Sequence, residues 1–196
     1  MRGKGNLLQK LGLILVLLSC VLLIGSELLA LYNRARVEKL TEQILLSLPD
    51  SSEGDPENYS DPRMPVLQLE GADFSGLIQV PSFGVTLPMG SDWDPGLISR
   101  YPCRFWGSAY DHSLILGGSS RKGQFDFCSR LDLGDRILVT DMTGARFSYE
   151  VVRIDRREQV DLDVFRETES HLTLFTRDET SGSYIVVSCI FSASQI

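Results

Sequence analysis

The side chains that could carry nucleophilic or acid–base chemistry are few, and their spacing matches no common catalytic or metal site. The sequence contains two histidines and four cysteines: His112, His171, Cys20, Cys103, Cys128 and Cys189. The cysteines form no CxxC pair, so a zinc knuckle is not expected. The chain also lacks a phosphate-binding loop, a G-x-S-x-G elbow and an HExxH motif. We therefore expect no metal and no cofactor, and interpret the two histidines as ordinary surface groups.

The overall composition fits one ordinary domain with an appendage, or two very small domains. The 196 residues are 43% hydrophobic and 23% charged, which is typical of globular proteins and excludes wholesale disorder. The formal net charge is −7. An acidic chain is a poor match for nucleic acid, because the phosphate backbone is also negative.

Residues 11–32 are predicted to form a transmembrane signal anchor. Glu27 is their only charged residue, and a helix of this length spans about 33 Å, enough to cross a hydrocarbon core. Three basic residues precede the segment: Arg2, Lys4 and Lys10. They predict a cytoplasmic tail over residues 1–10 and a single pass through the cell membrane, with the remainder outside. The alternative is a cleaved signal peptide, but no A-x-A cleavage site follows.

Two short segments are expected between this anchor and a single exported domain. Residues 33–48 carry a stripe of apolar residues at helical spacing: Val37, Leu40, Ile44, Leu45 and Leu48. The stripe predicts a juxtamembrane helix lying against the domain, with a coiled-coil dimer as the alternative. Residues 49–65 contain four prolines and several acidic residues, which predicts an extended, solvated linker or a surface loop. The domain then covers residues 66–196.

The exported domain is predicted to be all-β. Seven short apolar or alternating runs are separated by turn residues: 76–80, 84–88, 113–116, 135–140, 146–154, 172–176 and 184–189. Runs of this length with few helical stretches indicate a closed barrel or a sandwich.

The order of motifs in this domain resembles that of the sortases, the membrane-anchored cysteine transpeptidases of Gram-positive bacteria. The motifs run over residues 76–189 in family order: GLIQVPSFGVTLPM, YPCRFWGSAY, SLILGGSSRKGQF, LDLGD, ARFSYEVVRI, LTLFT and SYIVVSC. The resemblance implies a closed β-barrel of about eight strands with short helices. It also implies a reaction in which a cysteine thiolate attacks a sorting-signal carbonyl, assisted by a histidine and an arginine.

None of the three catalytic residues implied by the resemblance is present. The family histidine position is Ser119, the cysteine position after LTLFT is Arg177, and the arginine position opening the last strand is Tyr184. A guanidinium cannot act as a nucleophile, and a serine hydroxyl does not exchange protons near neutrality as an imidazole does. Tyr184 carries no positive charge for an oxyanion.

The remaining cysteines offer two further interpretations. Cys128 is read as a small buried hydrophobe. Cys103 and Cys189 fall where a subgroup of sortase-like proteins also has cysteine, and an exported domain permits a disulfide between them. A new cysteine–histidine pair using His112 or His171 is not favoured, because nothing in the sequence places such residues together.

Two functions follow from the resemblance. The first is a catalytically inactive pseudo-sortase that binds a sorting-signal peptide, a surface protein, a pilin or an active sortase. Arg177 would then pair with a ligand carboxylate, unless it is solvated or pairs internally with Asp178 or Glu179. The second is an active transpeptidase with a relocated nucleophile, attaching surface proteins to the cell wall or pili. A decaying gene product without a role is a third alternative.

Overall fold

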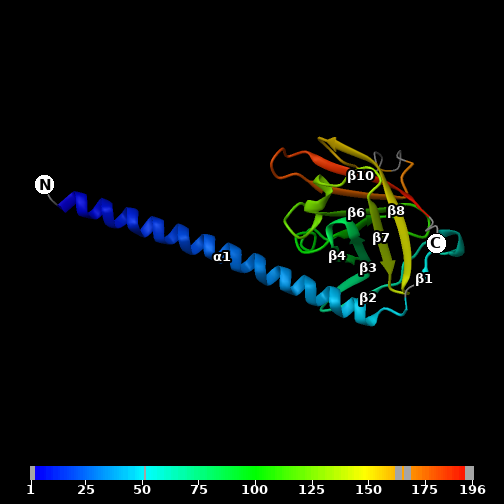
Figure 1. Ribbon diagram of the computed structural model, residues 1–196. Coiled ribbons are helices and arrows are strands. Elements are labelled where there is room, and N and C mark those ends of the chain that lie inside the picture. Colours follow the sequence, from blue (N-terminus) through cyan, green and yellow to red (C-terminus); the bar gives the residue numbers. More distant parts are fainter. Residues whose placement is uncertain (1–2, 51, 162–164, 166–168, 193–196) are drawn as a thin grey trace. The chain divides into compact units, whose positions relative to one another are not determined.

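The computed structural model describes residues 3–50, 52–161, 165 and 169–192 (Figure 1). The ends of the predicted tail and domain, residues 1–2 and 193–196, lie outside this range. In the described residues, the long helix α1 (Gly3–Ser47) is followed by the strands β1 (Ser52–Glu53), β2 (Leu67–Leu69), β3 (Ala72–Val80), β4 (Val85–Gly90), β5 (Cys103–Trp106), β6 (Leu114–Ser119), β7 (Arg136–Asp141), β8 (Ala145–Arg157), β9 (Leu172–Arg177) and β10 (Tyr184–Phe191). Three short 3-10 helices cover Pro56–Asn58, Pro81–Phe83 and Phe125–Ser129. Two compact units are present, residues 1–36 and 37–196.

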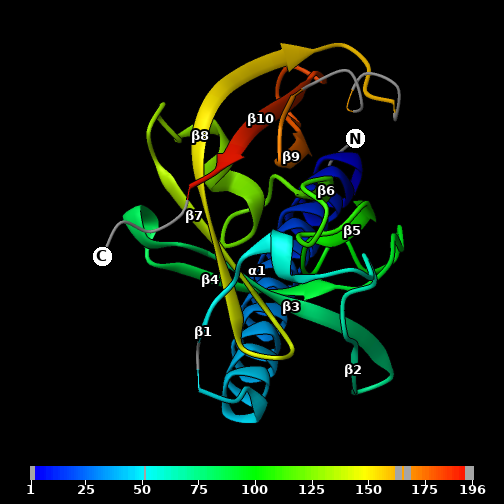
Figure 2. The same cartoon turned by 90° about the vertical axis from the view of Figure 1, so that its right-hand side faces the viewer.

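Eight of the described strands close into a barrel within the second unit. Around the wall the order is β3, β4, β5, β6, β9, β10, β8 and β7, and β7 pairs again with β3. The β4–β5 and β6–β9 pairs are parallel and the other pairs are antiparallel. The long strand β8 arches over the domain (Figure 2). The predicted all-β barrel of about eight strands is confirmed, and closure leaves the wall without an open edge.

The alternation of side chains along the strands divides the apolar residues between two faces of the wall. On β6, β9 and β10, one set fills the barrel interior: Leu114, Leu116, Leu172, Leu174, Ile185 and Val187. The alternate residues form a separate cluster on the outer face: Ile115, Phe175 and Val186 with Phe105, Phe165 and Trp93. Because successive side chains point to opposite faces, these strands read as continuous apolar runs instead of alternating ones.

All seven predicted strand runs are present, and three shorter strands were not predicted. Strand β5 contains only four residues between a proline and a glycine, and β1 contains only two. Strand β2 contains three residues. Such segments carry too few alternating positions to reveal a buried face, so their pairing partners determine that they form strands.

Residues 49–65 are largely exposed, as a linker or a surface loop would be, but the segment also contacts the barrel at fixed points. Strand β1 pairs in parallel with β8, and the Gly54 N–H donates to the Arg146 carbonyl at 2.8 Å. A Cβ at Gly54 would lie 2.7 Å from the Phe147 ring, so the backbone is packed directly on that side chain. Met64 is buried in the main core. The prolines restrict the backbone of this segment. Its contacts with the barrel fix its course, which composition alone does not predict.

The predicted helix over residues 33–48 is confirmed as the final part of α1, which continues without a break to Ser47. Within the second unit, Leu40 and Ile44 are buried against Phe74 and Leu77 of β3. These stripe positions are therefore covered by the barrel domain and are not available to a coiled-coil partner. Among the described residues, α1 is the one helix long and apolar enough to cross a membrane, and it contains the predicted anchor.

Candidate functional site

Ser119, Arg177 and Tyr184 lie side by side on three neighbouring strands at one rim of the barrel. Ser119 ends β6 and is the parallel partner of Arg177, which ends β9. Arg177 is in turn the antiparallel partner of Tyr184, the first residue of β10. Paired positions on adjacent strands have Cα atoms about 5 Å apart, so the three residues form a continuous row. The structure thus brings together the three positions selected from the sequence.

The row continues the outer face that carries the aromatic cluster. Gly117 and Phe175 precede Ser119 and Arg177 by two residues and therefore point to the same side of the wall. The rings of Trp93 and Phe175 stack with their centroids 5.6 Å apart. A Cβ at Gly117 would clash with both rings and would lie 2.5 Å from that of Phe175. The absence of a side chain at Gly117 lets these two rings pack flat against the wall. This packing forms an apolar surface next to the row.

A cavity of about 490 Å³ opens over two members of the row, Ser119 and Arg177. The residues that line it are Pro95, Ile98, Ser99, Gly118, Ser119, Ser120, Arg121, Arg177, Glu179 and Gly182. A smaller cavity of about 330 Å³ lies beside it and shares Ser120 and Glu179. The larger volume is typical of sites for small molecules or a few residues of peptide. Its lining combines apolar side chains with two guanidinium groups and several hydroxyls.

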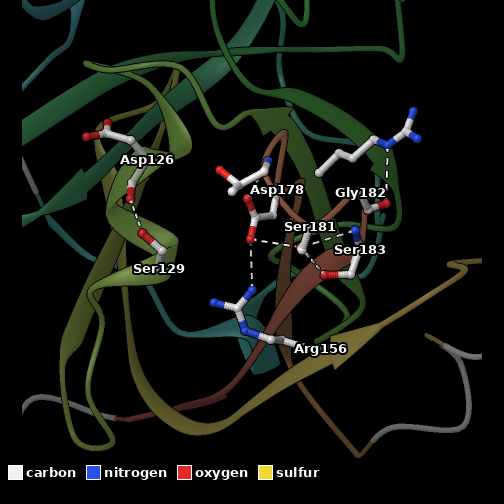
Figure 3. A network of polar contacts seen from close by, with 9 residues as sticks. Asp126, Ser129, Arg156, Asp178, Ser181, Gly182 and Ser183 are labelled. Carbon is white, nitrogen blue, oxygen red and sulfur yellow. Dashed lines mark hydrogen bonds and ion pairs between the residues drawn. The ribbon is translucent and has the colours of Figure 1, made fainter.

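The loop between β9 and β10 is held by Asp178 (Figure 3). Its carboxylate accepts hydrogen bonds from the Thr180 N–H at 2.9 Å and the Ser181 hydroxyl at 2.9 Å. Arg156 of β8 donates to the same carboxylate at 2.8 Å. The Thr180 N–H, then Arg156 and Ser181, hold the pKa of Asp178 well below its usual range. The Gly182 N–H also donates to the Asp178 backbone carbonyl at 2.8 Å, which fixes the turn.

Of the interpretations of Arg177, internal pairing with Asp178 or Glu179 is wrong, whereas its exposure is what the solvated alternative predicts. Asp178 forms its ion pair with Arg156, and Glu179 lies 3.8 Å from the Arg121 guanidinium. Arg177 is exposed, and its Nε donates to the Gly182 carbonyl at 3.4 Å. Within the part of the chain that the structure describes, Arg177 forms no ion pair with a carboxylate. Its guanidinium is thus oriented by the loop while its charge is uncompensated.

The two histidines lie together, but at the other end of strands β6 and β9. Their ring centroids are 4.2 Å apart, just ahead of the paired residues Leu114 and Leu172. Five residues of strand separate Leu114 from Ser119, about 17 Å, so no imidazole reaches the row. The Phe191 N–H donates to Nδ1 of His171 at 2.8 Å. Burial, and then the neighbouring His112, lower the pKa of His171.

This histidine pair was not predicted. Each residue precedes a strand in the sequence, but their meeting depends on the parallel β6–β9 pairing. Both histidines lie at strand ends, as the sequence suggested, but each is half-buried and its ring contacts the other.

The cysteines of the barrel domain are structural residues. Cys103, Cys128 and Cys189 are buried, and burial raises the pKa of all three thiols, that of Cys103 to about 11. A nucleophilic thiol requires a pKa lowered by a nearby cation, so these sites have the opposite character. His171 reaches Cys189 only through the backbone, by a 2.8 Å hydrogen bond from its N–H to the Cys189 carbonyl.

The disulfide considered between Cys103 and Cys189 is not formed in the structure. Both are free thiols, and they belong to different core clusters. Cys103 lies on β5 and Cys189 on β10, three strand steps apart around the barrel wall. That path is about 14 Å along the sheet, whereas a disulfide requires Cα atoms within about 7 Å of each other.

No protein-family model matches the chain, and no curated protein matches its sequence. Solved structures do resemble it. Sortase C-1 from Actinomyces oris shares 20% sequence identity and covers 83% of this chain and 98% of its own, with a TM-score of 0.54. A lid mutant of sortase A from Corynebacterium diphtheriae shares 17% identity over 83% of this chain and 95% of its own, with a TM-score of 0.55.

A third similar structure, sortase C from Clostridium perfringens, was solved with the C-terminal cell wall sorting motif. It shares 15% identity over 70% of this chain and 80% of its own, with a TM-score of 0.54. At these identities the likeness establishes architecture and not activity. The closed eight-stranded barrel and its agreement with these structures show that the chain has the sortase fold.

Proposed function

We propose that this protein is a membrane-anchored, extracellular and catalytically inactive member of the sortase family that binds a peptide or protein of the cell envelope. The observation that carries the proposal is the row formed by Ser119, Arg177 and Tyr184, of which Ser119 and Arg177 line the 490 Å³ cavity. The motif order assigns these positions to the histidine, cysteine and arginine of the sortase reaction. A cavity at positions that lack the side chains for acyl transfer supports a role in binding.

The inactivity follows from the properties of the three side chains. A guanidinium remains protonated in proteins and has no nucleophilic lone pair. Ser119 accepts a hydrogen bond from the Arg121 N–H at 3.3 Å, and within the described residues its hydroxyl makes no hydrogen bond to a histidine or carboxylate that could activate it. The barrel cysteines are buried and have raised thiol pKa values, so they are poor replacements. Losing residues that act as a unit removes the reaction, because their effects are strongly non-additive.

The proposed location rests on the apolar part of α1. Residues 11–32 provide a hydrocarbon-length span, and the basic residues ahead of it favour a cytoplasmic N-terminus. The barrel would then be outside the cell, tethered close to the membrane surface. The C. perfringens structure holds a sorting motif, which makes an extended peptide a reasonable class of ligand for the cavity here.

The test uses the full chain in lipid nanodiscs. It is incubated with a library of fluorescent sorting-type peptides and with peptides that carry a thiol-reactive vinyl sulfone, and an active sortase is treated in parallel. We expect peptide binding by fluorescence anisotropy but no cleavage and no covalent adduct in the intact mass. A peptide-directed adduct on Cys103, Cys128 or Cys189, or cleavage of any peptide, would overturn the proposal in favour of a relocated nucleophile.

A further inference from the structure

We propose that the cavity recognises a peptide through a free carboxylate, which the terminal nitrogens of Arg177 bind. The carboxylate is either the C-terminus of the peptide or an acidic side chain. This inference rests on the proposed binding function and specifies its ligand.

The charge of the cavity contrasts with that of the chain. The whole protein has a formal net charge of −7. The charged residues that line the cavity are Arg121, Arg177 and Glu179, which sum to +1. An otherwise acidic surface repels anions, so a positive cavity within it selects where a negative group can bind. A single negative charge would neutralise this lining.

The geometry of Arg177 leaves one face of its guanidinium for a ligand. Its Nε donates to the Gly182 carbonyl at 3.4 Å, and the two terminal nitrogens remain for another acceptor. Two parallel N–H groups match the two oxygens of a carboxylate. Gly182 is itself fixed by its N–H bond to the Asp178 carbonyl at 2.8 Å. The arginine is therefore partly oriented before binding, which lowers the entropic cost of forming the pair.

The rest of the lining fits a peptide better than an inorganic ion. Pro95 and Ile98 supply apolar surface on one side of the cavity. Ser119 accepts a bond from the Arg121 N–H, so its hydroxyl proton is available to donate to a ligand oxygen. A ligand that combines an acid group with apolar or amide surface would use all of these groups at once.

A multiply charged phosphate fits less well than a carboxylate. The second guanidinium, Arg121, already has the Glu179 carboxylate 3.8 Å away. That carboxylate repels a dianion in the same cavity, and the arrangement provides only one uncompensated cation. A phosphate group would also require more donors than one free guanidinium edge supplies.

The experiment uses an array of short peptides, each synthesised both as the free acid and as the C-terminal amide, with and without internal Asp or Glu. Phosphopeptides are included as separate spots. The full chain in nanodiscs is applied as wild type, Arg177→Gln, Arg177→Lys and the matched control Arg63→Gln. Arg63 pairs with Asp61 on the surface and does not line the cavity. The Kd values of the best peptides are then measured in solution by anisotropy.

We expect Arg177→Gln to weaken binding about tenfold, Arg177→Lys to weaken it less, and Arg63→Gln to leave it unchanged. Selectivity for free acids over amides identifies a C-terminal carboxylate, and selectivity for internal Asp or Glu identifies a side chain. Binding that ignores both kinds of carboxylate, that requires phosphate, or that survives Arg177→Gln overturns this inference and leaves the binding function standing. Failure of the wild type to bind any peptide overturns both.

Discussion

Introducing the three catalytic residues that the motif order assigns to this row, in one variant, should create a reactive thiol at the rim of the barrel. The variant carries Ser119→His, Arg177→Cys and Tyr184→Arg. Strand pairing places the three Cα atoms about 5 Å apart in a row on one face of the wall. A thiol at position 177 would then lie between an imidazole and a guanidinium, and both would favour the thiolate over the thiol.

The size of the effect follows from the change in the thiol pKa. An isolated cysteine with a pKa of about 8.5 is about 3% thiolate at pH 7, and a pKa of about 7 raises that fraction to about 50%. Thiolates of lower pKa are also less nucleophilic, with a Brønsted coefficient of about 0.45. The net gain in the alkylation rate is therefore only about threefold at pH 7 but about sixfold at pH 6. The midpoint of the pH–rate profile moves further, by about 1.5 pH units.

The assay is alkylation by iodoacetamide between pH 5 and 9, followed by peptide mass spectrometry. Every variant also carries Cys20→Ser, which removes the thiol of the apolar helix. The buried thiols of Cys103, Cys128 and Cys189 serve as internal references. The matched control carries Arg177→Cys alone, which presents the same thiol without its two neighbours. If the triple variant and this control give the same pH–rate midpoint, the side chains do not face one another and the proposed site geometry is wrong.

Two further predictions concern the wall and its ends. Gly117→Val should reduce the free energy of unfolding by about 1–3 kcal/mol, because its side chain would enter the space that Trp93 and Phe175 fill. Thermal unfolding measures this loss, and Ser119→Ala, which faces the cavity on the same strand, should leave stability nearly unchanged. The lowered pKa of His171 means that the unfolded chain binds its proton more readily, so stability should fall as the pH drops below about 6.5. Urea unfolding at several pH values measures this dependence. The free energy of unfolding should fall less steeply with decreasing pH in His171→Gln than in the wild type, and an equal fall in both would contradict this reasoning.

The barrel could be predicted from the sequence because its strands carry their own signals. The run over residues 146–154 alternates polar and apolar side chains, and the last two strands are apolar runs bounded by turn residues. The contacts of residues 49–65 with the barrel could not be predicted, for an equally physical reason. Proline-rich acidic composition indicates a lack of intrinsic structure, but Gly54 and Met64 show that contacts with a preformed barrel fix the path of such a segment.

The site was only partly predictable. The row at Ser119, Arg177 and Tyr184 could be located because strand order and motif order determine which residues become neighbours. The partner of Arg177 could not be predicted from adjacency in sequence. Asp178 is its nearest acidic neighbour along the chain, yet successive residues of an extended strand point to opposite faces. Asp178 therefore meets Arg156 of β8 instead.

The three differences from the sortase pattern are electrostatically linked. An arginine at position 184 would sit directly opposite Arg177 in the antiparallel pair, and like charges in that arrangement are destabilising. An imidazolium at position 119 would add a third cation, because that position pairs with Arg177 from the other side. With a tyrosine and a serine as its neighbours, Arg177 keeps its charge without repulsion from either strand. The row therefore forms a consistent arrangement around one cation, as a site for an anionic group requires.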